Sequence, residues 1–583
     1  MKYKLKYKLN EPFLDNLLIK RGIKKEDLDK FYNPTKENYL EPTLLDHMQD
    51  GVELIDKYIN SPNPIDLIVD CDVDGYTSAA EMYLFIKRLN PQKEIRYYIH
   101  SGKQHGLEDM VDNLLDTDNC ELVICPDSAS NDYKQHELLR GAGIEIFILD
   151  HHEVDCGYSQ YAVTINNQLS ENYSNKALSG ATVVYKFINY YAEAKELNNE
   201  DKLYIESLID LAAVGAIGDM MDVTTLENRY LFTKGLQNIT NAGLLSLIYK
   251  QEYSLGGIDN LNPIKIAFYI VPLMNALIRV GTENEKKTLF RSLIYGEEAV
   301  QSTKRGSKLG QLEPICEQNA RNCVNAKNRQ KREEDKALEY FDFIIEKNNL
   351  NDNKILIVEN NTDKFNSNLT GLIAMKIMNK YNKPVLLVKE NDEGVLKGSI
   401  RNNDKSELKD FRTFLNNSGL CDYVQGHANA AGIGIKKSLT DKLLEYANSN
   451  LKDIDFTEGV YLVDFILGNN KEENIKLIKD IYNARSIFGQ GCDEPLLVTE
   501  NITLRKEDIT VMGKTADTIK FTYNGIEYIQ FKAKDFIKQY SQLGNRFFTL
   551  TVLGRAGINN FMGRETPQIT IVDYNIRDSI LDF

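Results

Sequence analysis

Three aspartates, Asp70, Asp72 and Asp74, alternate along the chain directly after the apolar run of residues 67–69, and Gly75 follows them. Three carboxylates this close repel one another, and burying them requires a counter-charge. A strand that leads into such a cluster and is followed by a glycine and a helix is a common way to present ligands to a hard divalent cation. The alternative is a solvated acidic turn, because the same spacing occurs in calcium loops and by chance.

Three further segments place polar side chains just after apolar runs. Asp127 follows residues 123–125, where it could equally cap the next helix, and Asp150-His151-His152 follows residues 147–149. Asp219 follows a run of small and apolar residues at 212–218, which would let a helix pack closely.

Taken together, these segments supply five carboxylates and an imidazole: Asp70, Asp72, Asp74, Asp127, Asp219 and His151. This set exceeds the needs of one zinc ion and suits two oxygen-preferring cations, with the histidine favouring manganese over magnesium. Two such metals stabilise the attacking and leaving oxygens of phosphoryl transfer and supply a hydroxide at neutral pH. The residues therefore predict a metal-dependent phosphoesterase.

The elements around these residues predict how they are brought together. Short apolar runs at 66–69, 94–99, 122–125 and 145–149 alternate with helix-like segments at 78–89, 107–116 and 132–142. Such alternation indicates a mostly parallel sheet with helices on both faces. In such sheets ligands bind beyond the carboxyl ends of the strands, where the aspartates are expected.

The remaining sequence predicts an α/β protein of several parts. A helical segment at 1–60 precedes the parallel-sheet domain at 61–303, and a long connecting helix is expected at 304–348. A smaller α/β domain follows at 349–454, and β-rich runs after it predict a small barrel at 455–583.

Composition limits the classes of function. The net charge of −15 argues against a general nucleic-acid-binding protein, although a local basic groove is compatible with it. We find no apolar run near the ~18–20 residues that cross a bilayer, so no membrane association is expected. The eight cysteines form no CxxC pair, which indicates reduced thiols and a cytoplasmic protein.

The ordered motifs resemble those of the DHH phosphoesterase superfamily, and within it the RecJ single-strand-specific 5′→3′ DNA exonucleases. The resemblance covers nearly the whole chain. It rests on residues 70–75, Asp127, residues 150–152 and residues 218–219, on the helix segment 275–279, on the two segments 398–401 and 426–432 of a DHH-associated domain, and on residues 560–573 of an OB-fold domain.

This resemblance implies roles for individual residues. Six side chains would hold or orient two divalent metals, manganese preferred and magnesium the alternative: Asp70, Asp72, Asp127, Asp150, His151 and Asp219. Asp74 and His152 would activate water or contact phosphate. Ser399 and Arg401 would bind the 5′-terminal phosphate, with Arg279 as a further phosphate contact, and His427 in the loop of Gly426 would lie near the scissile phosphate.

The chain departs from the family pattern at three places. Gln425 precedes Gly426 where a glycine is usual, and Ile278 replaces a glycine before Arg279. The loop at 100–107 lacks an expected phosphate-binding arginine, and Lys103 is the nearest substitute, as a point charge without a fork of donors. Strict recognition of a 5′ end is therefore in doubt, whereas hydrolysis is not.

The leading hypothesis is a monomeric 5′→3′ exonuclease that cuts single-stranded DNA to mononucleotides in repair, recombination or replication. A single-strand-binding protein or a helicase would supply the strand, and the enzyme would act in the cytoplasm, that of the host if the chain is of phage origin. One alternative is a phosphodiesterase of short oligonucleotides or cyclic dinucleotides, which chain length disfavours. Another is a non-catalytic replication scaffold, which the intact metal motifs disfavour.

Overall fold

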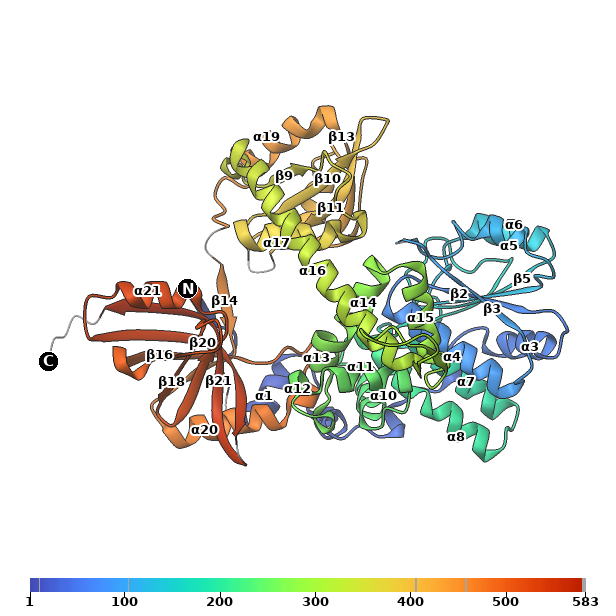
Figure 1. Cartoon of the computed structure of the whole chain (residues 1–583), viewed down its shortest axis with the longest axis horizontal. Coiled ribbons are helices and arrows are strands. Elements are labelled where there is room, and N and C mark those ends of the chain that lie inside the picture. The colour runs from blue at the N-terminus through green and yellow to red at the C-terminus, as the bar shows by residue number, and fades with distance from the viewer. Residues whose placement is uncertain (10, 103, 404–405, 457–458, 562, 579–583) are drawn as a thin grey trace. The chain divides into compact units, whose positions relative to one another are not determined.

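The computed structural model describes residues 1–583 except 10, 103, 404–405, 457–458, 562 and 579–583 (Figure 1). The chain forms two units. One comprises Glu26–Lys331 and Ser486–Cys492, and we call it the aspartate unit. The other comprises Met1–Lys25, Arg332–Arg485 and Asp493–Phe583, and we call it the mixed-sheet unit.

The start of the chain differs from the predicted helical segment at 1–60. Helices α1 (Phe13–Lys20) and α3 (Met48–Ile59) form there, but strand β1 (Lys2–Leu5) pairs in parallel with β14 (Val460–Val463). Residues 1–25 therefore belong with the C-terminal part of the chain. A pairing between two short strands so far apart in sequence leaves no periodic signal, so it could not be predicted.

The aspartate unit is built on a five-stranded parallel sheet in the order β3-β2-β4-β5-β6. Its strands are β2 (Ile65–Val69), β3 (Ile95–Ile99), β4 (Leu122–Pro126), β5 (Glu145–Asp150) and β6 (Val163–Asn166). The chain passes from β2 to β3 on one side and then to β4 on the other. This reversal creates a crevice at the carboxyl ends of β2 and β4, where ligands of such sheets bind.

Helices cover both faces of this sheet (Figure 1). Residues of α5 (Val111–Leu115) and α6 (Tyr133–Gly141) share a core cluster with Ile68, Val123 and Ile146. Helices α3, α4 (Val73–Leu89) and α7 (Gly180–Ala194) contact the strands from the opposite face. Helix α9 (Ile209–Gly218) packs on α4 and α7.

The rest of the aspartate unit is mainly helical. Its helices are α2 (Leu28–Tyr32), α8 (Asn199–Ser207), α10 (Leu226–Gln237), α11 (Ala242–Lys250), α12 (Glu252–Leu255), α13 (Pro263–Lys265), α14 (Val271–Val280) and α15 (Glu283–Ile294). The stretch Pro263–Val280 has a mean hydropathy of 1.4 over 18 residues, so the expectation that the chain has no apolar run of about this length is wrong. Half of this stretch is buried within the protein, as in a core helix.

The long connecting helix is present but begins later than predicted. Helix α16 spans Ile315–Lys347, and the residues before it form a hairpin of β7 (Ala299–Gln301) and β8 (Leu312–Pro314). Pro314 and the left-handed Gly306 and Gly310 disfavour helix in the segment that precedes α16.

The mixed-sheet unit contains a five-stranded sheet in the order β12-β13-β11-β10-β9. Its strands are β9 (Leu356–Glu359), β10 (Val385–Glu390), β11 (Val395–Arg401), β12 (Tyr423–His427) and β13 (Ala430–Lys436), and only β9 and β10 pair in parallel. Helix α17 (Thr370–Tyr381) packs on β10 and β11. Phe411 of α18 (Phe411–Asn417) and Leu443 of α19 (Thr440–Asn450) join the core cluster of the strands.

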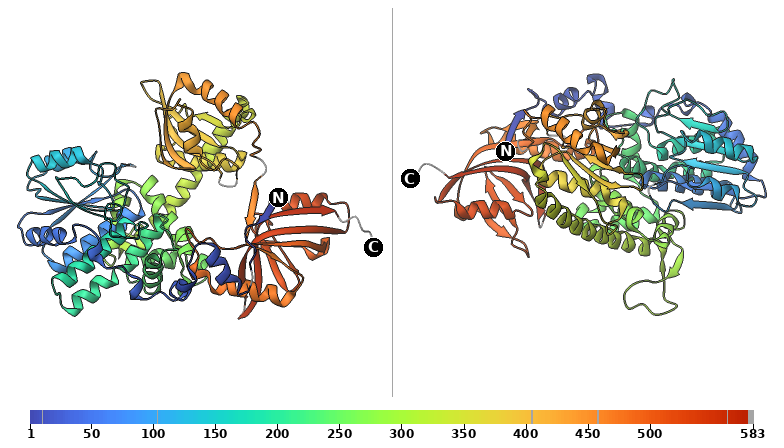
Figure 2. Two further views of the ribbon diagram at one scale, coloured as in Figure 1. Left: turned by 180° about the vertical axis from the view of Figure 1, so that it is seen from behind. Right: turned by 90° about the horizontal axis from the view of Figure 1, so that it is seen from above.

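A seven-stranded mixed sheet lies near the C-terminus, in the order β15-β16-β20-β21-β19-β18-β17. Its strands are β15 (Phe465–Leu467), β16 (Leu496–Arg505), β17 (Thr510–Met512), β18 (Thr518–Tyr523), β19 (Ile526–Gln530), β20 (Phe547–Phe561) and β21 (Arg564–Asp578), accompanied by α20 (Lys471–Asn483) and α21 (Lys534–Gln542). Both views in Figure 2 show β20 and β21 as long neighbouring strands.

Candidate metal centre

The predicted aspartates of the parallel sheet meet at the crevice between β2 and β4. Asp70 follows β2, Asp127 follows β4, and Asp150 is the last residue of β5. Each has at most 2% of its surface exposed. The Asp127 N–H donates to the Leu149 carbonyl at 2.8 Å. This hydrogen bond continues the pairing of β4 and β5 and fixes the positions of Asp127 and Asp150 at the ends of these strands.

Asp70 and Asp72 are held by different donors. Asp70 Oδ2 lies 2.6 Å from His105 Nδ1, and its Oδ1 accepts the Gly106 N–H at 3.3 Å. Asp72 is the N-cap of α4 and accepts the Gly75 N–H at 3.0 Å. Burial, reinforced by Asp74 and Asp70, raises the pKa of Asp72 to about 6.

Gly75 is required by this packing. A Cβ at Gly75 would lie 2.5 Å from Asp70 Cβ, closer than two carbon atoms approach. The glycine after the three aspartates therefore allows the first turn of α4 to fold back on the end of β2. This explains the glycine that the sequence places directly after the acidic run.

Asp74 lies against the N-terminus of α7. Its Oδ2 accepts the Gly180 N–H at 2.6 Å, and its Oδ1 accepts the Ala181 N–H at 3.1 Å. The positive end of the helix dipole thus stabilises its charge. A Cβ at Gly215 of α9 would lie 2.5 Å from Asp74 Oδ1, so the small residues at 212–218 do permit the close approach that the sequence indicated.

The surroundings of Asp127 strongly oppose the ionisation of its carboxylate. Burial and the nearby charges of Asp74 and Asp72 raise its pKa well above the usual range. Its Oδ1 makes no hydrogen bond with the described residues, although His151 Nε2 lies 3.2 Å away. Its backbone also has a left-handed φ of 62°, a conformation that aspartate tolerates and that occurs at functional sites.

His151 and Asp219 complete this side of the site. His151 Nε2 lies 3.4 Å from Asp219 Oδ2 and 3.9 Å from Asp74 Oδ2. Burial lowers the pKa of His151, so its ring is neutral and can offer a nitrogen lone pair. Asp219 caps the C-terminus of α9, where burial and the charge of Asp74 raise its pKa to about 8.

Asp150 is saturated by protein donors. Its Oδ1 accepts the His151 N–H and the His152 Nδ1–H, both at 2.7 Å, and its Oδ2 accepts the Ser130 N–H at 3.1 Å. Burial opposes ionisation, but the charge and hydrogen bond of His152 hold the pKa of Asp150 well below its usual range. Although burial opposes the charge on His152, Asp150 raises the pKa of that half-exposed ring to about 9.

The donor set fits divalent cations. Three groups of the predicted site residues have ligand atoms within 4.8 Å of one another: Asp70 with Asp72 and Asp127, Asp74 with His151 and Asp219, and Asp127 with Asp150, His151 and His152. Burial and neighbouring carboxylates raise the pKa of Asp127, and its unsatisfied Oδ1 points to a missing positive partner. Carboxylate oxygens with one imidazole suit manganese or magnesium.

Four of the predicted phosphate contacts lie in the mixed-sheet unit. Ser399 and Arg401 lie on β11 of the mixed-sheet unit, beside the N-terminus of α17, since a Cβ at Gly371 would be 3.6 Å from Ser399 Oγ and 2.4 Å from Arg401 Nη2. Gly426, with φ of 128°, precedes the exposed His427 at the end of β12.

One further predicted contact is described in the aspartate unit. Arg279 is half-buried in the last turn of α14, and Lys103 falls outside the described residues. Ile278, which stands where the family pattern has a glycine, is part of the core.

Sequence reasoning missed two buried or paired groups at the site. His105 contacts Asp70, and only its place in the departing loop at 100–107 could have indicated it. Glu81 of α4 is fully buried, and neither of its oxygens has a hydrogen-bond partner in the described part of the chain. Burial and the charge of Asp74 raise the pKa of Glu81 well above its usual range.

Aromatic side chains can stack on nucleic-acid bases, and two of them in the region of the C-terminal sheet differ in exposure. Tyr528 is fully buried, stacks on Phe521 at 4.9 Å and hydrogen-bonds Thr499. Phe531, by contrast, has 62% of its surface exposed. Tyr528 is therefore a core residue, and Phe531 is available for stacking.

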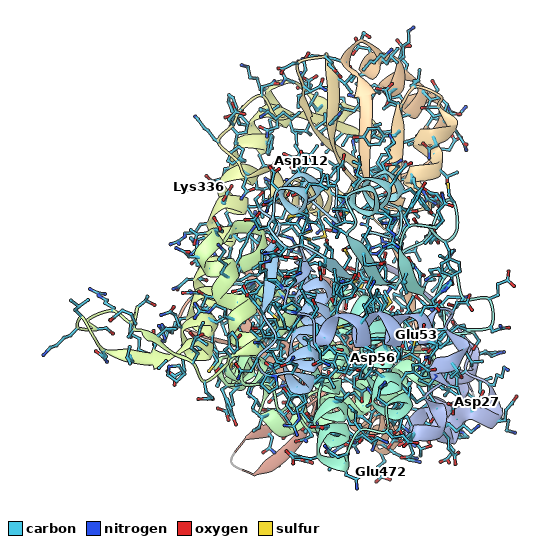
Figure 3. All side chains as sticks on the ribbon, turned by 90° about the vertical axis from the view of Figure 1, so that its right-hand side faces the viewer. Asp27, Glu53, Asp56, Asp112, Lys336 and Glu472 are labelled. Atoms are coloured by element: carbon cyan, nitrogen blue, oxygen red, sulfur yellow. The ribbon has the colours of Figure 1, made fainter. Side chains whose placement is uncertain are left out.

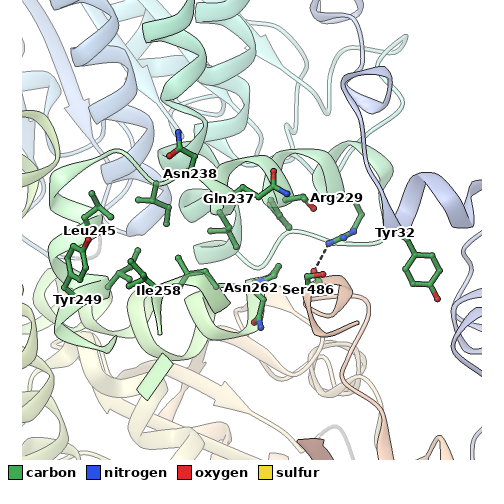
Figure 4. Close-up of a pocket in the computed structure, with 16 residues that line it drawn as sticks. Tyr32, Arg229, Gln237, Asn238, Leu245, Tyr249, Ile258, Asn262 and Ser486 are labelled. Atoms are coloured by element: carbon green, nitrogen blue, oxygen red, sulfur yellow. Dashed lines mark hydrogen bonds between the residues drawn. The ribbon is translucent and has the colours of Figure 1, made fainter. Parts of the chain in front are cut away.

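A cavity of about 630 Å³ lies in the aspartate unit away from the acidic groups (Figure 4). Its lining includes Arg229, Phe232, Tyr249 and Ser486. The buried Arg229 donates to the Ser486 carbonyl at 2.8 Å, the contact drawn in Figure 4. Among the residues that the structure describes, no aspartate or histidine lines it, so the acidic cluster remains the candidate centre.

Comparison with known proteins identifies the class of fold. The DHH family, N-terminal domain, matches residues 65–216, the DHHA1 domain matches residues 352–453, and the RecJ OB domain matches residues 469–573. The fold is similar to that of RecJ in complex with Mn²⁺ from Thermus thermophilus, with a TM-score of 0.71 and 18% identity over 97% of this chain and 76% of that chain. The predicted α/β architecture with a long helix and a C-terminal OB-type domain is confirmed.

Two relatives define the family more closely. The chain is 36% identical over 569 residues to a Bacillus subtilis (strain 168) protein provisionally named SPbeta prophage-derived single-strand DNA-specific exonuclease YorK, covering 97% of this chain and 96% of that protein. It is 25% identical over 579 residues to the single-stranded-DNA-specific exonuclease RecJ of the same organism, and the match covers 96% of this chain and 68% of that protein. The chain belongs to this RecJ/YorK family of single-strand DNA-specific exonucleases.

Proposed function

We propose that this protein is a metal-dependent exonuclease that hydrolyses single-stranded DNA from the 5′ end to mononucleotides. The observation that carries the proposal is the buried Asp127 carboxylate, whose Oδ1 lacks a hydrogen bond with the described residues and lies 3.2 Å from His151 Nε2. Its membership of the RecJ/YorK family supports single-stranded DNA as the substrate.

Five side chains would hold two divalent cations, manganese preferred: Asp70, Asp72, Asp127, His151 and Asp219. When bound, such cations supply a nucleophile at neutral pH and stabilise charge on the phosphate oxygens. Asp150, although predicted as a metal ligand, would act mainly by orienting His152, because its oxygens already accept four N–H groups: the backbone N–H groups of Ser130, His151 and His152, and the Nδ1–H of His152.

The residues around the metals would bind and orient the strand. His152, with a pKa raised to about 9, is protonated at neutral pH, and its Nδ1–H donates to Asp150. Its second N–H is then a suitable donor to a phosphate oxygen. Asp74 would position α7 rather than bind metal, because both of its oxygens accept N–H groups of that helix.

The 5′ phosphate would bind at Ser399 and Arg401. Both side chains lie beside Gly371 in the first turn of α17, where helix N–H groups favour an anion. His427 and Gly426 would approach the scissile phosphate, and Arg279 and Lys103 would contact the backbone of the strand. Exposed Phe531 would stack on a base.

The domain limits follow the same proposal. A phosphoesterase domain at 61–303 and an associated domain at 349–454 contain the matches to residues 65–216 and 352–453. An OB-type domain at 455–583 contains the match to residues 469–573. We further propose a monomer that acts in the cytoplasm, that of the host for a phage protein, on strands supplied by a helicase or a single-strand-binding protein.

The test uses single- and double-stranded 20-mers labelled at the 5′ or the 3′ end, with manganese or magnesium at one fixed salt concentration. We expect mononucleotides from the 5′ end of single strands only. Asp127→Ala should abolish cleavage and keep the wild-type circular dichroism spectrum. The exposed carboxylate Asp112, labelled with Glu53 in Figure 3, provides the matched control Asp112→Ala.

Two outcomes would overturn the proposal. Turnover of dinucleotides but not of the 20-mer would assign the protein to the short-oligonucleotide phosphodiesterases. Absence of both manganese binding and cleavage would assign it to the non-catalytic scaffolds. Wild-type activity of Asp127→Ala would refute the site.

A further inference from the structure

A second set of donors lies on one side of the acidic cluster and differs from it in chemistry. It consists of Asp70, Cys71 and His105, whose ligand atoms all lie within 4.8 Å of one another. Cys71 Sγ is 3.5 Å from His105 Nε2 and 3.7 Å from His105 Nδ1. The same Nδ1 is 2.6 Å from Asp70 Oδ2. Sulfur, nitrogen and oxygen donors thus lie close together.

These spacings are close to those around a tetrahedral zinc ion. Ligands bound to zinc at about 2.0–2.3 Å are about 3.3–3.8 Å apart. The sulfur–nitrogen distances of 3.5–3.7 Å already lie in this range. Only the distance between His105 Nδ1 and Asp70 Oδ2, now 2.6 Å, would have to lengthen. The hydrogen bond between these two atoms would be replaced by their bonds to zinc.

The surroundings favour a bound cation and leave a path to it. The side chain of His105 is 58% exposed, so an ion can reach the site from solvent, whereas Asp70 is buried. His100 Nε2 is buried, lies 3.7 Å from Asp70 Oδ1 and has no hydrogen-bond partner among the described residues. A second imidazole nitrogen therefore lies beside the shared carboxylate without a hydrogen bond of its own.

The loop that carries the two histidines is anchored. Lys286 Nζ donates to the Ser101 carbonyl at 2.6 Å and to the His100 carbonyl at 3.3 Å. His100 Nδ1 lies 3.0 Å from Asp109 Oδ1. These contacts fix residues 100 and 101 beside the site.

We propose that Asp70, Cys71 and His105 form a zinc site that inhibits the enzyme. Manganese and magnesium prefer oxygen donors, whereas a thiolate with an imidazole selects zinc. On binding, zinc takes the place of the thiol proton, which leaves to solvent, and breaks the hydrogen bond between His105 and Asp70. Because Asp70 is also expected to bind the catalytic metals, zinc withdraws it from them; this inhibitory consequence rests on the proposed function.

The first experiment tests the site without any nuclease assay. The full-length protein is freed of metal and titrated with cobalt(II), which reports a thiolate ligand through a near-ultraviolet sulfur-to-cobalt charge-transfer band. We expect the band in the wild-type protein, its loss in Cys71→Ser, and its retention in Cys156→Ser, which removes an exposed cysteine of the same unit. Absence of the band, or its persistence in Cys71→Ser, would overturn the proposal.

The second experiment measures zinc affinity by competition with a chromophoric chelator. Cys71→Ser and His105→Gln should each weaken the tightest zinc site by at least about ten-fold, as loss of a ligand does, and Cys156→Ser should leave it unchanged. Equal zinc affinity in the wild-type protein and Cys71→Ser would refute the site, whatever the protein does to DNA.

The third experiment tests the consequence. Zinc is titrated against manganese-dependent cleavage of single-stranded DNA, with the chelator fixing free zinc. Half-inhibition of Cys71→Ser should need at least about ten-fold more zinc than the wild type, in proportion to the lost affinity. Equal inhibition of both proteins would refute the inhibitory role. If neither protein cuts DNA while the cobalt band is present, the proposed function fails and the zinc site stands.

Discussion

Gly180→Ala perturbs the metal centre through one methyl group and leaves every charged residue in place. Gly180 begins α7, and its N–H donates to Asp74 Oδ2 at 2.6 Å. A Cβ there would lie 2.4 Å from Asp127 Cβ and 2.6 Å from Asp127 Cα. Carbon atoms in contact are about 3.5–4.0 Å apart, so α7 and Asp127 must separate by about 1 Å or more.

This displacement should affect activity more than stability. Overpacking costs about 1–3 kcal/mol, but replacing glycine by alanine at a position with negative φ returns about 0.4–1 kcal/mol through the unfolded chain. A displacement of about 1 Å at a reacting centre costs about 100-fold in rate. We therefore expect kcat for manganese-dependent cleavage of a 5′-labelled single strand to fall about 100-fold, with weaker manganese binding by electron paramagnetic resonance.

The matched control is Gly141→Ala. Gly141 ends α6 in the same unit, and a Cβ there would meet nothing within 4 Å. Its activity should equal that of the wild type, and its stability should be equal or higher by about 0.4–1 kcal/mol. Wild-type kcat and manganese affinity in Gly180→Ala would contradict the view that α7 and Asp127 form one rigid wall of the site.

Four further expectations concern charge. Asp127→Asn should abolish cleavage yet raise the Tm of the metal-free protein by calorimetry, because burial and neighbouring carboxylates make the ionised group unfavourable. The pKa values of Asp72 and Asp219 are raised to about 6 and about 8, so the folded state without metal binds more protons than the unfolded state. In EDTA the Tm should therefore fall as the pH rises from about 4 to 8, and added manganese should prevent this fall. The buried Lys186 Nζ lies 2.6 Å from Glu227 Oε1, and Glu227→Gln would leave this lysine without its charged partner. The substitution should lower the free energy of unfolding in urea by about 3–5 kcal/mol. Arg401→Lys should reduce the preference for 5′-phosphorylated over 5′-hydroxyl strands about ten-fold, since lysine loses the fork of donors, and an unchanged ratio would exclude Arg401 from end recognition.

The sequence predicted those parts of the fold in which an apolar run is followed directly by a residue that can bind a metal. Apolar runs that end in a carboxylate indicated β2, β4 and β5, and parallel pairing then brings Asp70, Asp127 and Asp150 to one edge. Each of these features depends on a few consecutive residues and on one general property of parallel sheets.

The parts that sequence did not predict depend on contacts between distant segments. The pairing of β1 with β14, and the placing of Ser486–Cys492 with the aspartate unit, involve short stretches without periodicity. His105 reaches Asp70 only because the loop after β3 folds back over the end of β2. The need for Gly180 appears only when α7 is placed against Asp127.

The alternating aspartates illustrate why residue type alone does not assign roles. Although they are two residues apart, they occupy the end of a strand, the N-cap of a helix and its first turn. Asp74 has both oxygens satisfied by α7, whereas Asp72 accepts one N–H and its pKa is raised to about 6. A carboxylate whose charge is already stabilised by protein donors gains less from a cation than one that burial has destabilised. Asp72 and Asp127 should therefore gain most from the metals, and Asp74 from the helix that it anchors.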